Sequence, residues 1–348
     1  PLAYKDAVFL SPHKFIGGPG TPGLLVVKKA LGGRPMPTQP GGGTVEFVTD
    51  STHMYSHDLT HREESGTPAI LESIRCGLVF QLKERVGPHA IHAREQALVK
   101  GAIDAWGRNP AIQVLGPKDG ERLSIVSFVV RYGRGYRHHN FVVALLNDLF
   151  GIQSRGGCSC AGPYGAFLLG LGRGDIDAYM ELTTRGLTSI KPGWARVNFN
   201  YFISQVEYAY IVQAVNLVAS LGWAMLPSYR LCPLTGLWSH RDGSPYRPAS
   251  LAELQLGPHG PSWPAAERTR PESALADALI EGERLLWAAV RSAGRSAAPD
   301  RIDEQLDTSR WFPLPHEVAA WLGTQGSAPA SDPAGGGSLS GLDSPAAP

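Results

Sequence analysis

The chain has 348 residues, 43% of them hydrophobic and 18% charged, so it is long enough to bury a sizeable core and is not globally disordered. Its 32 Lys and Arg residues against 31 Asp and Glu residues leave a formal charge of +1, which does not argue for a nucleic-acid or membrane partner. No apolar run approaches the roughly 18 residues of a membrane span, and four cysteines are too few for a disulfide scaffold. A reducing, cytoplasmic compartment is therefore expected, with an organellar one left open because the chain starts at Pro1 without a Met.

Residues 1–88 combine short apolar strands, glycine-rich turns and a helix. Strands are predicted at 7–10 and 24–27, where apolar residues stand between turn signals. The helix is predicted to begin near Pro68, because apolar residues follow at helical spacing, and to stop at Gly87.

Residues 89–222 predict a smaller α+β domain. Ser204 and Glu207 form a capping box ahead of an apolar face, which predicts a helix over 205–221. The other elements predicted from apolar periodicity are helices at about 89–107 and 140–149 and strands at 111–115 and 123–132.

The remainder of the chain is rich in proline and has little periodicity. Residues 223–322 predict an irregular extension with one helix at about 272–293. Residues 323–348 consist mainly of Ala, Gly, Ser, Pro and Asp, which cannot bury enough apolar surface to order themselves. We therefore expect a disordered tail.

Lys14 stands at the end of the first predicted strand, between His13 and a glycine-rich turn. A lysine that forms an imine with an aldehyde cofactor needs a fixed backbone, a short reach and a partly desolvated site, and a strand end beside a tight turn meets these needs. An ordinary surface lysine before a β-turn is the alternative. The G-x-G-x-x-G pattern at Gly18, Gly20 and Gly23 does not indicate a dinucleotide site, because prolines fill its variable positions and a strand follows it.

A glycine-rich cysteine loop is the second candidate site. Arg155 precedes Cys158 and Cys160, and a nearby cation lowers the pKa of a thiol and raises its nucleophilic thiolate fraction. Two alternatives are half of a metal site and cysteines that a loop merely tolerates. Since the upstream His138 and His139 match known zinc spacings poorly, we predict no metal.

Arg196 enters a predicted strand directly after Trp194 and Ala195. An arginine in this position either clamps a carboxylate through two hydrogen bonds or forms a structural ion pair. On the local sequence alone, the structural ion pair is the favoured interpretation.

Together these segments resemble the class V aminotransferase superfamily of pyridoxal-phosphate enzymes, most closely its cysteine desulfurase and selenocysteine lyase branch. The resemblance covers about residues 1–222. Four motifs carry it. Ser11-x-His13-Lys14 resembles the family's Schiff-base motif, and Gly41-Gly42-Gly43 resembles its glycine-rich loop at the subunit boundary. Glu64-x-Gly66-Thr67-Pro68 resembles the family's E-x-G-T-P motif, and Arg155-x-Gly157-x-x-Cys160 is similar to its R-x-G-x-x-C loop.

The resemblance implies a set of residues for the cofactor pyridoxal 5'-phosphate. Lys14 would bind the cofactor as an imine, and Ser11 and His13 would lie near its phosphate. Thr67 would reach the phosphate bound to the neighbouring subunit, which makes a homodimer the expected assembly.

The resemblance also implies a reaction. Cys160 would be the nucleophile and Arg196 the partner of the substrate carboxylate, so that sulfur or selenium leaves cysteine or selenocysteine through an enzyme persulfide and passes to an acceptor, such as a sulfur-acceptor protein. One alternative is another class V enzyme, an aminotransferase or epimerase, in which Cys160 is idle. The other is a catalytically dead chain that acts only as a scaffold.

The fold class that the resemblance implies is α/β, the fold type I of pyridoxal-phosphate-dependent transferases, with an incomplete large domain in 1–88. In the family, the carboxylate for the pyridine nitrogen, the stacking ring and the phosphate loop all lie upstream of the imine lysine. Only thirteen residues precede Lys14 here, and Asp6 is the one acidic residue among them. We therefore expect the chain to be the C-terminal portion of a longer protein.

Overall fold

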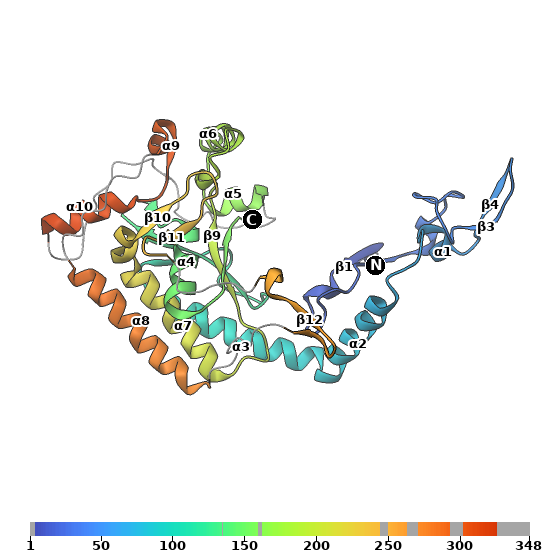
Figure 1. Cartoon of the computed structure of the whole chain (residues 1–348), viewed down its shortest axis with the longest axis horizontal. Helices are drawn as coiled ribbons and strands as arrows, with labels where there is room; N and C mark the ends of the chain where they lie inside the picture. Colours follow the sequence, from blue (N-terminus) through green and yellow to red (C-terminus); the bar gives the residue numbers. More distant parts are fainter. Residues whose placement is uncertain are drawn as a thin grey trace. The chain divides into compact units, whose positions relative to one another are not determined.

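The computed structural model describes residues 4–133, 135–158, 162–243, 250–262, 271–292 and 302–325. It divides the chain into two units, Pro1–Ala93 and Arg94–Pro348, and the division falls inside the helix α3 (Pro88–Trp106). Figure 1 shows the elements in chain order, and each unit is described by itself. The division lies five residues beyond the boundary predicted at 88 and leaves residues 223–325 in the second unit.

The first unit is built from two hairpins and a long helix. The antiparallel strands β1 (Ala7–Leu10) and β2 (Leu24–Val27) have the predicted bounds, and Ala7 pairs with Val27. The other elements are η1 (Pro12–Lys14), η2 (Lys29–Leu31), the hairpin of β3 (Val45–Val48) and β4 (His53–Tyr55), α1 (Leu59–Glu63) and α2 (Ile70–Val86).

The apolar side chains of this unit are largely exposed. On β1 and β2, Phe9 is 81% exposed and Val26 is 59% exposed. On α2, apolar residues recur every four positions on a face that we call the α2 stripe, whose members are all exposed: Ile70, Ile74, Leu78, Leu82 and Val86. A contiguous apolar face of this kind is typical of a surface that another polypeptide covers.

The second unit has an antiparallel sheet in the order β5–β6–β9–β8, with β7 paired to the end of β6. On β6, Val126 and Phe128 are buried whereas Ile125 is exposed, because one face of the strand packs against helices. The strands are β5 (Ile112–Val114), β6 (Ile125–Tyr132), β7 (Gly135–Tyr136), β8 (Arg155–Gly157) and β9 (Trp194–Asn198).

Helices supply the rest of the core of this unit. The predicted capping box is present: Ser204 Oγ accepts a hydrogen bond from the backbone N–H of Glu207 at 3.0 Å, and a Glu207 carboxylate oxygen accepts one from Ser204 N–H at 2.8 Å. The helix α7 (Gln205–Leu221) that follows confirms the predicted bounds. The other helices are α4 (His139–Phe150), α5 (Gly162–Leu168), α6 (Arg173–Thr184) and η3 (Thr188–Ile190).

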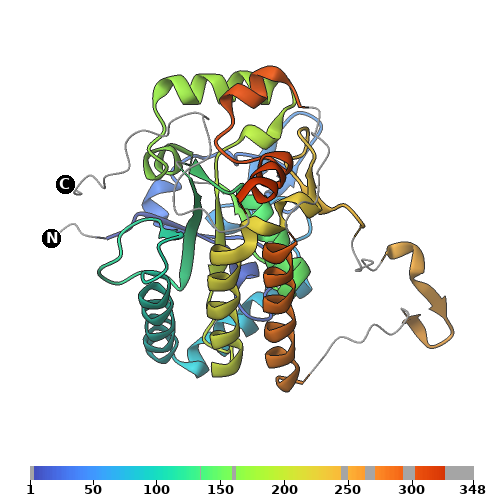
Figure 2. The same cartoon turned by 90° about the vertical axis from the view of Figure 1, so that its left-hand side faces the viewer.

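The prediction of an irregular extension with one helix was wrong. The helix predicted at 272–293 is α8 (Ser273–Arg291), which runs beside α7 (Figure 2). Trp238, Leu286 and Phe312 from the extension are buried in the core. Trp238 and Phe312 are single anchors outside the predicted helix, so they leave no periodic signal. The further elements are η4 (Gly222–Ser228), β10 (Tyr229–Leu231), β11 (Trp238–His240), η5 (Leu251–Glu253), β12 (Gln255–Gly257), β13 (Gly260–Ser262), α9 (Glu304–Ser309) and α10 (Pro315–Gln325). Because α10 runs to Gln325, residues 323–325 are helical and not part of a disordered tail, and 326–348 lie outside the described residues.

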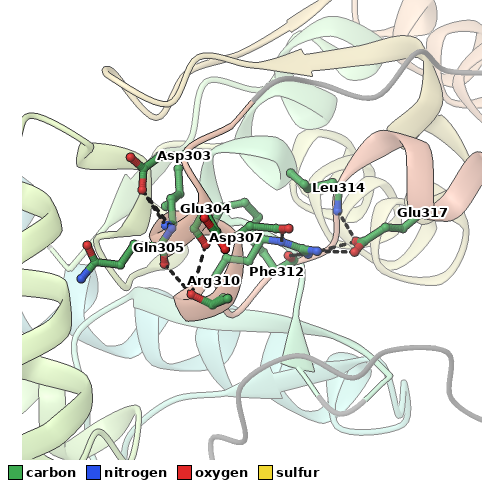
Figure 3. A network of polar contacts seen from close by, with 10 residues as sticks. Asp303, Glu304, Gln305, Asp307, Arg310, Phe312, Leu314 and Glu317 are labelled. Atoms are coloured by element: carbon green, nitrogen blue, oxygen red, sulfur yellow. Dashed lines mark hydrogen bonds and ion pairs between the residues drawn. The ribbon is translucent and has the colours of Figure 1, made fainter.

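Residues 302–325, which we call the strap, are held in place by Arg310 (Figure 3). The Arg310 guanidinium donates to Asp307 Oδ1 at 2.6 Å and to the carbonyl of Phe312 at 2.7 Å, and it pairs with both oxygens of the Glu317 carboxylate. Glu317 also accepts a hydrogen bond from the backbone N–H of Leu314 at 2.8 Å. The turn around Phe312 is thereby fixed.

One helical stretch in the described part of the chain, Gln205–Ser228, is long and apolar enough to cross a membrane, contrary to expectation. The expectation counted unbroken apolar runs, and polar residues such as Gln213 and Asn216 interrupt this stretch. Buried core helices have the same length and composition, and 61% of the most apolar window is buried within the structure.

Candidate active site

Lys14 lies at the end of η1, directly after β1, in a tightly folded turn. Lys14 N–H donates to the carbonyl of Ser11 at 3.0 Å, and Phe15 N–H donates to that of Pro12 at 2.9 Å. The chain then folds back so closely that a Cβ at Gly18 would collide with both the Pro12 and Phe15 carbonyl oxygens. The backbone at Lys14 is fixed, as the sequence predicts, whereas its side chain is exposed and not partly desolvated within the described residues.

The structure joins two of the glycine-rich segments that the sequence singles out. Gly66, which has a φ of +82°, donates its N–H to the carbonyl of Gly42 at 2.7 Å. Thr67, the next residue, is exposed. The described chain contains no hydrogen bond or ion pair from Thr67 to Lys14.

Ser11 and His13 flank Pro12 at the start of the turn, where Ser11 is half-buried and His13 is exposed. A lysine, a hydroxyl and an imidazole on one fixed turn suit the attachment point and the phosphate end of pyridoxal phosphate. Asp6 does not suit the pyridine nitrogen, because its carboxylate pairs with Lys28 Nζ at 3.0 Å. The described residues therefore fit one end of the cofactor.

The cysteine loop predicted as flexible begins as a strand. Arg155–Gly157 forms β8 and pairs with β9, where Gly157 lies opposite Trp194. Cys158 follows and is half-buried, with its Cβ 3.7 Å from the position that a Cβ on Gly165 would take. The predicted nucleophile Cys160 lies outside the described residues.

Arg196 sits in the middle of β9, an inner strand of the sheet, with another arginine directly opposite on the edge strand β8. The register pairs Arg196 of β9 with Arg155 of β8 on one side and with Ser127 of β6 on the other. Side chains that face each other in an antiparallel pair point to the same face of the sheet, and like charges placed so destabilise it. In the described part of the chain, no ion pair or hydrogen bond joins the Arg196 guanidinium to another residue, and its role as a carboxylate clamp stays a prediction. We call these residues the arginine pair.

The predicted site residues thus fall into two groups. Ser11, His13, Lys14 and Thr67 belong to the first unit, and Arg196 belongs to the second. Among the described residues, no group of three or more His, Cys, Asp or Glu side chains could hold a metal ion.

Sequence reasoning missed the role of two buried histidines before α4. His138 and His139 stack at a ring-centroid distance of 4.4 Å, and His138 Nε2 lies 3.0 Å from the carbonyl oxygen of Ser189. Burial lowers the pKa of His139 to about 4 and places that of His138 well below its usual value. The glycines at 156, 157 and 193 were the available signal, because these rings need close-packed backbone beside them.

Comparison with known proteins shows which family these segments are similar to. Residues 4–171 match the family model Aminotransferase class-V. A probable cysteine desulfurase of Staphylococcus aureus is 30% identical over 158 residues, which are 45% of this chain and 37% of that protein. Probable cysteine desulfurase 2 of Mycobacterium leprae is 31% identical over 159 residues, 45% of this chain and 36% of that protein. The matches confirm the resemblance and, with the mixed α and β architecture, the predicted fold class.

The chain matches only about 37% of the length of these curated relatives. Among solved structures, the apo structure of cysteine desulfurase from Thermococcus onnurineus NA1 is 24% identical, with a TM-score of 0.48 over 62% of this chain and 47% of that one.

Proposed function

From the match of residues 4–171 to the class V aminotransferase family, we propose that the protein serves a pyridoxal-phosphate-dependent cysteine desulfurase reaction. The observation that carries this proposal is the arginine pair, in which Arg155, shortly before the cysteines, lies opposite Arg196 in the register of β8 and β9. Such a pair suits an anionic substrate, and a free amino acid carries the required carboxylate.

In this reaction Lys14 would be the covalent attachment point of the cofactor, and Ser11 and His13 would lie near its phosphate. Thr67 would reach the phosphate of the cofactor bound to the neighbouring subunit. When bound, the cofactor withdraws electrons from the substrate Cα. Lys14 moves the proton at that carbon, and Arg196 holds the substrate carboxylate.

The thiolate of Cys160 then attacks the substrate sulfur. A sulfur–sulfur bond forms and the carbon–sulfur bond breaks, with its electron pair passing to carbon, which takes up a proton. The products are alanine and an enzyme persulfide, whose outer sulfur passes to an acceptor. Selenocysteine would react in the same way through selenium.

The complete site needs groups that the described residues do not supply. Asp6 is engaged by Lys28, so the pyridine-nitrogen carboxylate must come from elsewhere. The α2 stripe and the exposed faces of β1 and β2 support the proposal that another polypeptide covers the first unit, and a homodimer is the assembly we propose.

The cofactor assignment is tested with Lys14→Ala and the control Lys29→Ala, both on exposed lysines of the first unit. We expect Lys14→Ala to abolish the visible absorbance of bound pyridoxal phosphate and all sulfide release, because the attachment amine is gone. Lys29→Ala should keep both. An unchanged cofactor spectrum in Lys14→Ala would remove Lys14 from the site.

The arginine pair is tested with Arg196→Lys, which keeps the charge but loses the two-bond fork. We expect a loss of about 1–3 kcal/mol of substrate binding, seen as a higher KM with cofactor absorbance unchanged. Equal kinetics would return Arg196 to a structural role.

The aminotransferase alternative is separated from the desulfurase by Cys160→Ser and its neighbour variant Cys158→Ser. We expect Cys160→Ser to lose sulfide release while slow transamination continues, and Cys158→Ser to keep most of the rate. Mass spectrometry should find the persulfide on Cys160 in the wild type. A persulfide on neither cysteine would favour the aminotransferase.

A further inference from the structure

The strap packs directly on the two buried histidines. The Trp311 ring lies nearly parallel to both, at 5.4 Å and 13° from His138 and at 5.8 Å and 15° from His139. Its indole N–H donates to the carbonyl of Ile190 at 3.0 Å, and its own carbonyl accepts a hydrogen bond from Tyr136 N–H of β7 at 3.4 Å. Trp311 is therefore fixed by stacking and by hydrogen bonds at both ends.

The His139 ring in turn lies against the backbone that leads into the cysteine loop. A Cβ on Gly156 would come within 3.0 Å of His139 Cδ2, and a Cβ on Gly193 would come within 2.9 Å of His139 Cε1. The Gly193 position would also be 2.6 Å from the Cα of Gly157. Real Cβ atoms do not occupy such positions, so the imidazole and these glycines fit together only because no side chain separates them.

Cys158 directly follows Gly157, so the close packing of Gly157 against Gly193 also restrains the backbone at Cys158. Gly157 has a φ of +103°, which favours glycine, and connects the strand β8 to Cys158. On the far side of Cys158, Gly165 of α5 packs against the ring of Trp194, with a Cβ position 3.1 Å from that ring. Any displacement of His139 must therefore move β8 or open a gap beneath it.

We infer that Trp311 and His139 are positioning residues for Cys158: the strap holds His139 through Trp311, and His139 holds the Gly156–Gly157 strand that leads into Cys158. The strap lies outside residues 4–171, where the family match ends. The catalytic consequence of this arrangement rests on the proposed function, whereas the positioning itself does not.

The experiment measures the rate at which iodoacetamide alkylates Cys158 in the full chain, by peptide mass spectrometry. Trp311→Ala and His139→Ala should each raise this rate about tenfold, the factor given by a loss of about 1.4 kcal/mol of local stability. Trp311→Phe keeps an aromatic ring on the histidines and should stay within about twofold of the wild type. Trp287→Ala, at a half-exposed tryptophan of α8, is the matched control and should leave the rate unchanged.

An unchanged Cys158 rate in both Trp311→Ala and His139→Ala would overturn the inference, as would an equal rise in Trp287→Ala. If circular dichroism shows that Trp311→Ala unfolds the second unit, Gly193→Ala becomes the test variant for the positioning of Cys158. Its new Cβ would collide with Gly157 and with the His139 ring. A rise in Gly193→Ala with none in the control Gly174→Ala, where no atom lies within 4 Å of the new Cβ, supports the inference. No rise in Gly193→Ala overturns it.

Alkylation requires neither cofactor nor substrate, so this test separates the two proposals. If the protein shows desulfurase activity, Trp311→Ala should lower kcat and leave KM unchanged, because Arg196 and not the thiol sets carboxylate binding. If no activity is found but the alkylation rates respond, the proposed function fails and the positioning role stands.

Discussion

The two units of the chain differ in how far their apolar side chains are buried. On α2 of the first unit the residues at every fourth position face outward, and Cys76 and Val79 are the buried members of that helix. In the second unit, Trp106 and Phe128 are fully buried at a ring-centroid distance of 5.5 Å. The lysine therefore sits on a unit that depends on an outside surface, and the arginine pair sits on one that packs its own core.

Polar groups show the same contrast. Arg137 of the second unit is fully buried and donates to the carbonyls of Val218 and Ala219 at 2.7 and 2.8 Å, which completes the last turn of α7. Burial lowers the pKa of this arginine to about 9. In the first unit the pair of Lys28 and Asp6 lies on the surface, where such pairs contribute little to stability.

The largest expected effect comes from truncating one leucine in each unit. Leu145→Ala removes a fully buried side chain and should lower the free energy of unfolding by about 4 kcal/mol, because it leaves a cavity. Leu78→Ala on the α2 stripe should change it by less than about 0.5 kcal/mol, because this side chain is 58% exposed. Urea unfolding measures both. An equal cost would mean that the stripe is covered in solution, and the comparison between the units would then fail.

The next effect is a pH dependence that the buried histidines give to the second unit. The pKa of His139 falls to about 4 when the unit folds and lies near 6.5 in the unfolded chain. The unfolded state therefore binds the proton more tightly, and stability is complete above about pH 6.5 and declines as the pH falls towards 4, by about 3 kcal/mol. Urea unfolding at several pH values should show this decline, and His139→Gln should reduce it. A slope unchanged by His139→Gln would assign the pH dependence to other groups.

A smaller effect is expected at the strap. Arg310→Ala removes the bonds to Asp307, Glu317 and the carbonyl of Phe312 from a side chain that is 14% exposed. We expect a loss of about 2 kcal/mol in thermal or urea unfolding, because the carboxylate of Glu317 is left partly buried without its partner. The matched variant Arg284→Ala breaks an exposed pair with Glu281 on α8 and should leave the unfolding midpoint where it is. Equal midpoints for both variants would show that the strap does not depend on Arg310.

Elements with local signals were predictable from the sequence. The helix at 205–221 has a capping box, and the strands at 7–10 and 24–27 flank the segment 12–23, which is rich in glycine and proline, so these elements have local boundary signals. β8 could not be predicted, because it contains two glycines in three residues and becomes a strand only by pairing with β9.

In the candidate site, too, residues with a local sequence signal could be recognised and residues placed by distant contacts could not. Lys14 and Arg196 were recognisable by residue type and position, and their roles stay predictions. The position of His139 was not recognisable, because it depends on Trp311 and on glycines from two separate segments. Contacts between residues this far apart in the chain leave no spacing to detect.

The arginine pair has a consequence for the edge of the sheet. β8 is the edge strand, and β9 is the one strand with which it pairs in the described sheet. Arg155 and Arg196 lie opposite each other in this pairing and repel each other. A carboxylate bound between them turns the repulsion into attraction, so that binding and strand pairing become thermodynamically linked. An anionic ligand would then stabilise the pairing of β8 with β9, and the melting temperature of the second unit should rise with the ligand concentration.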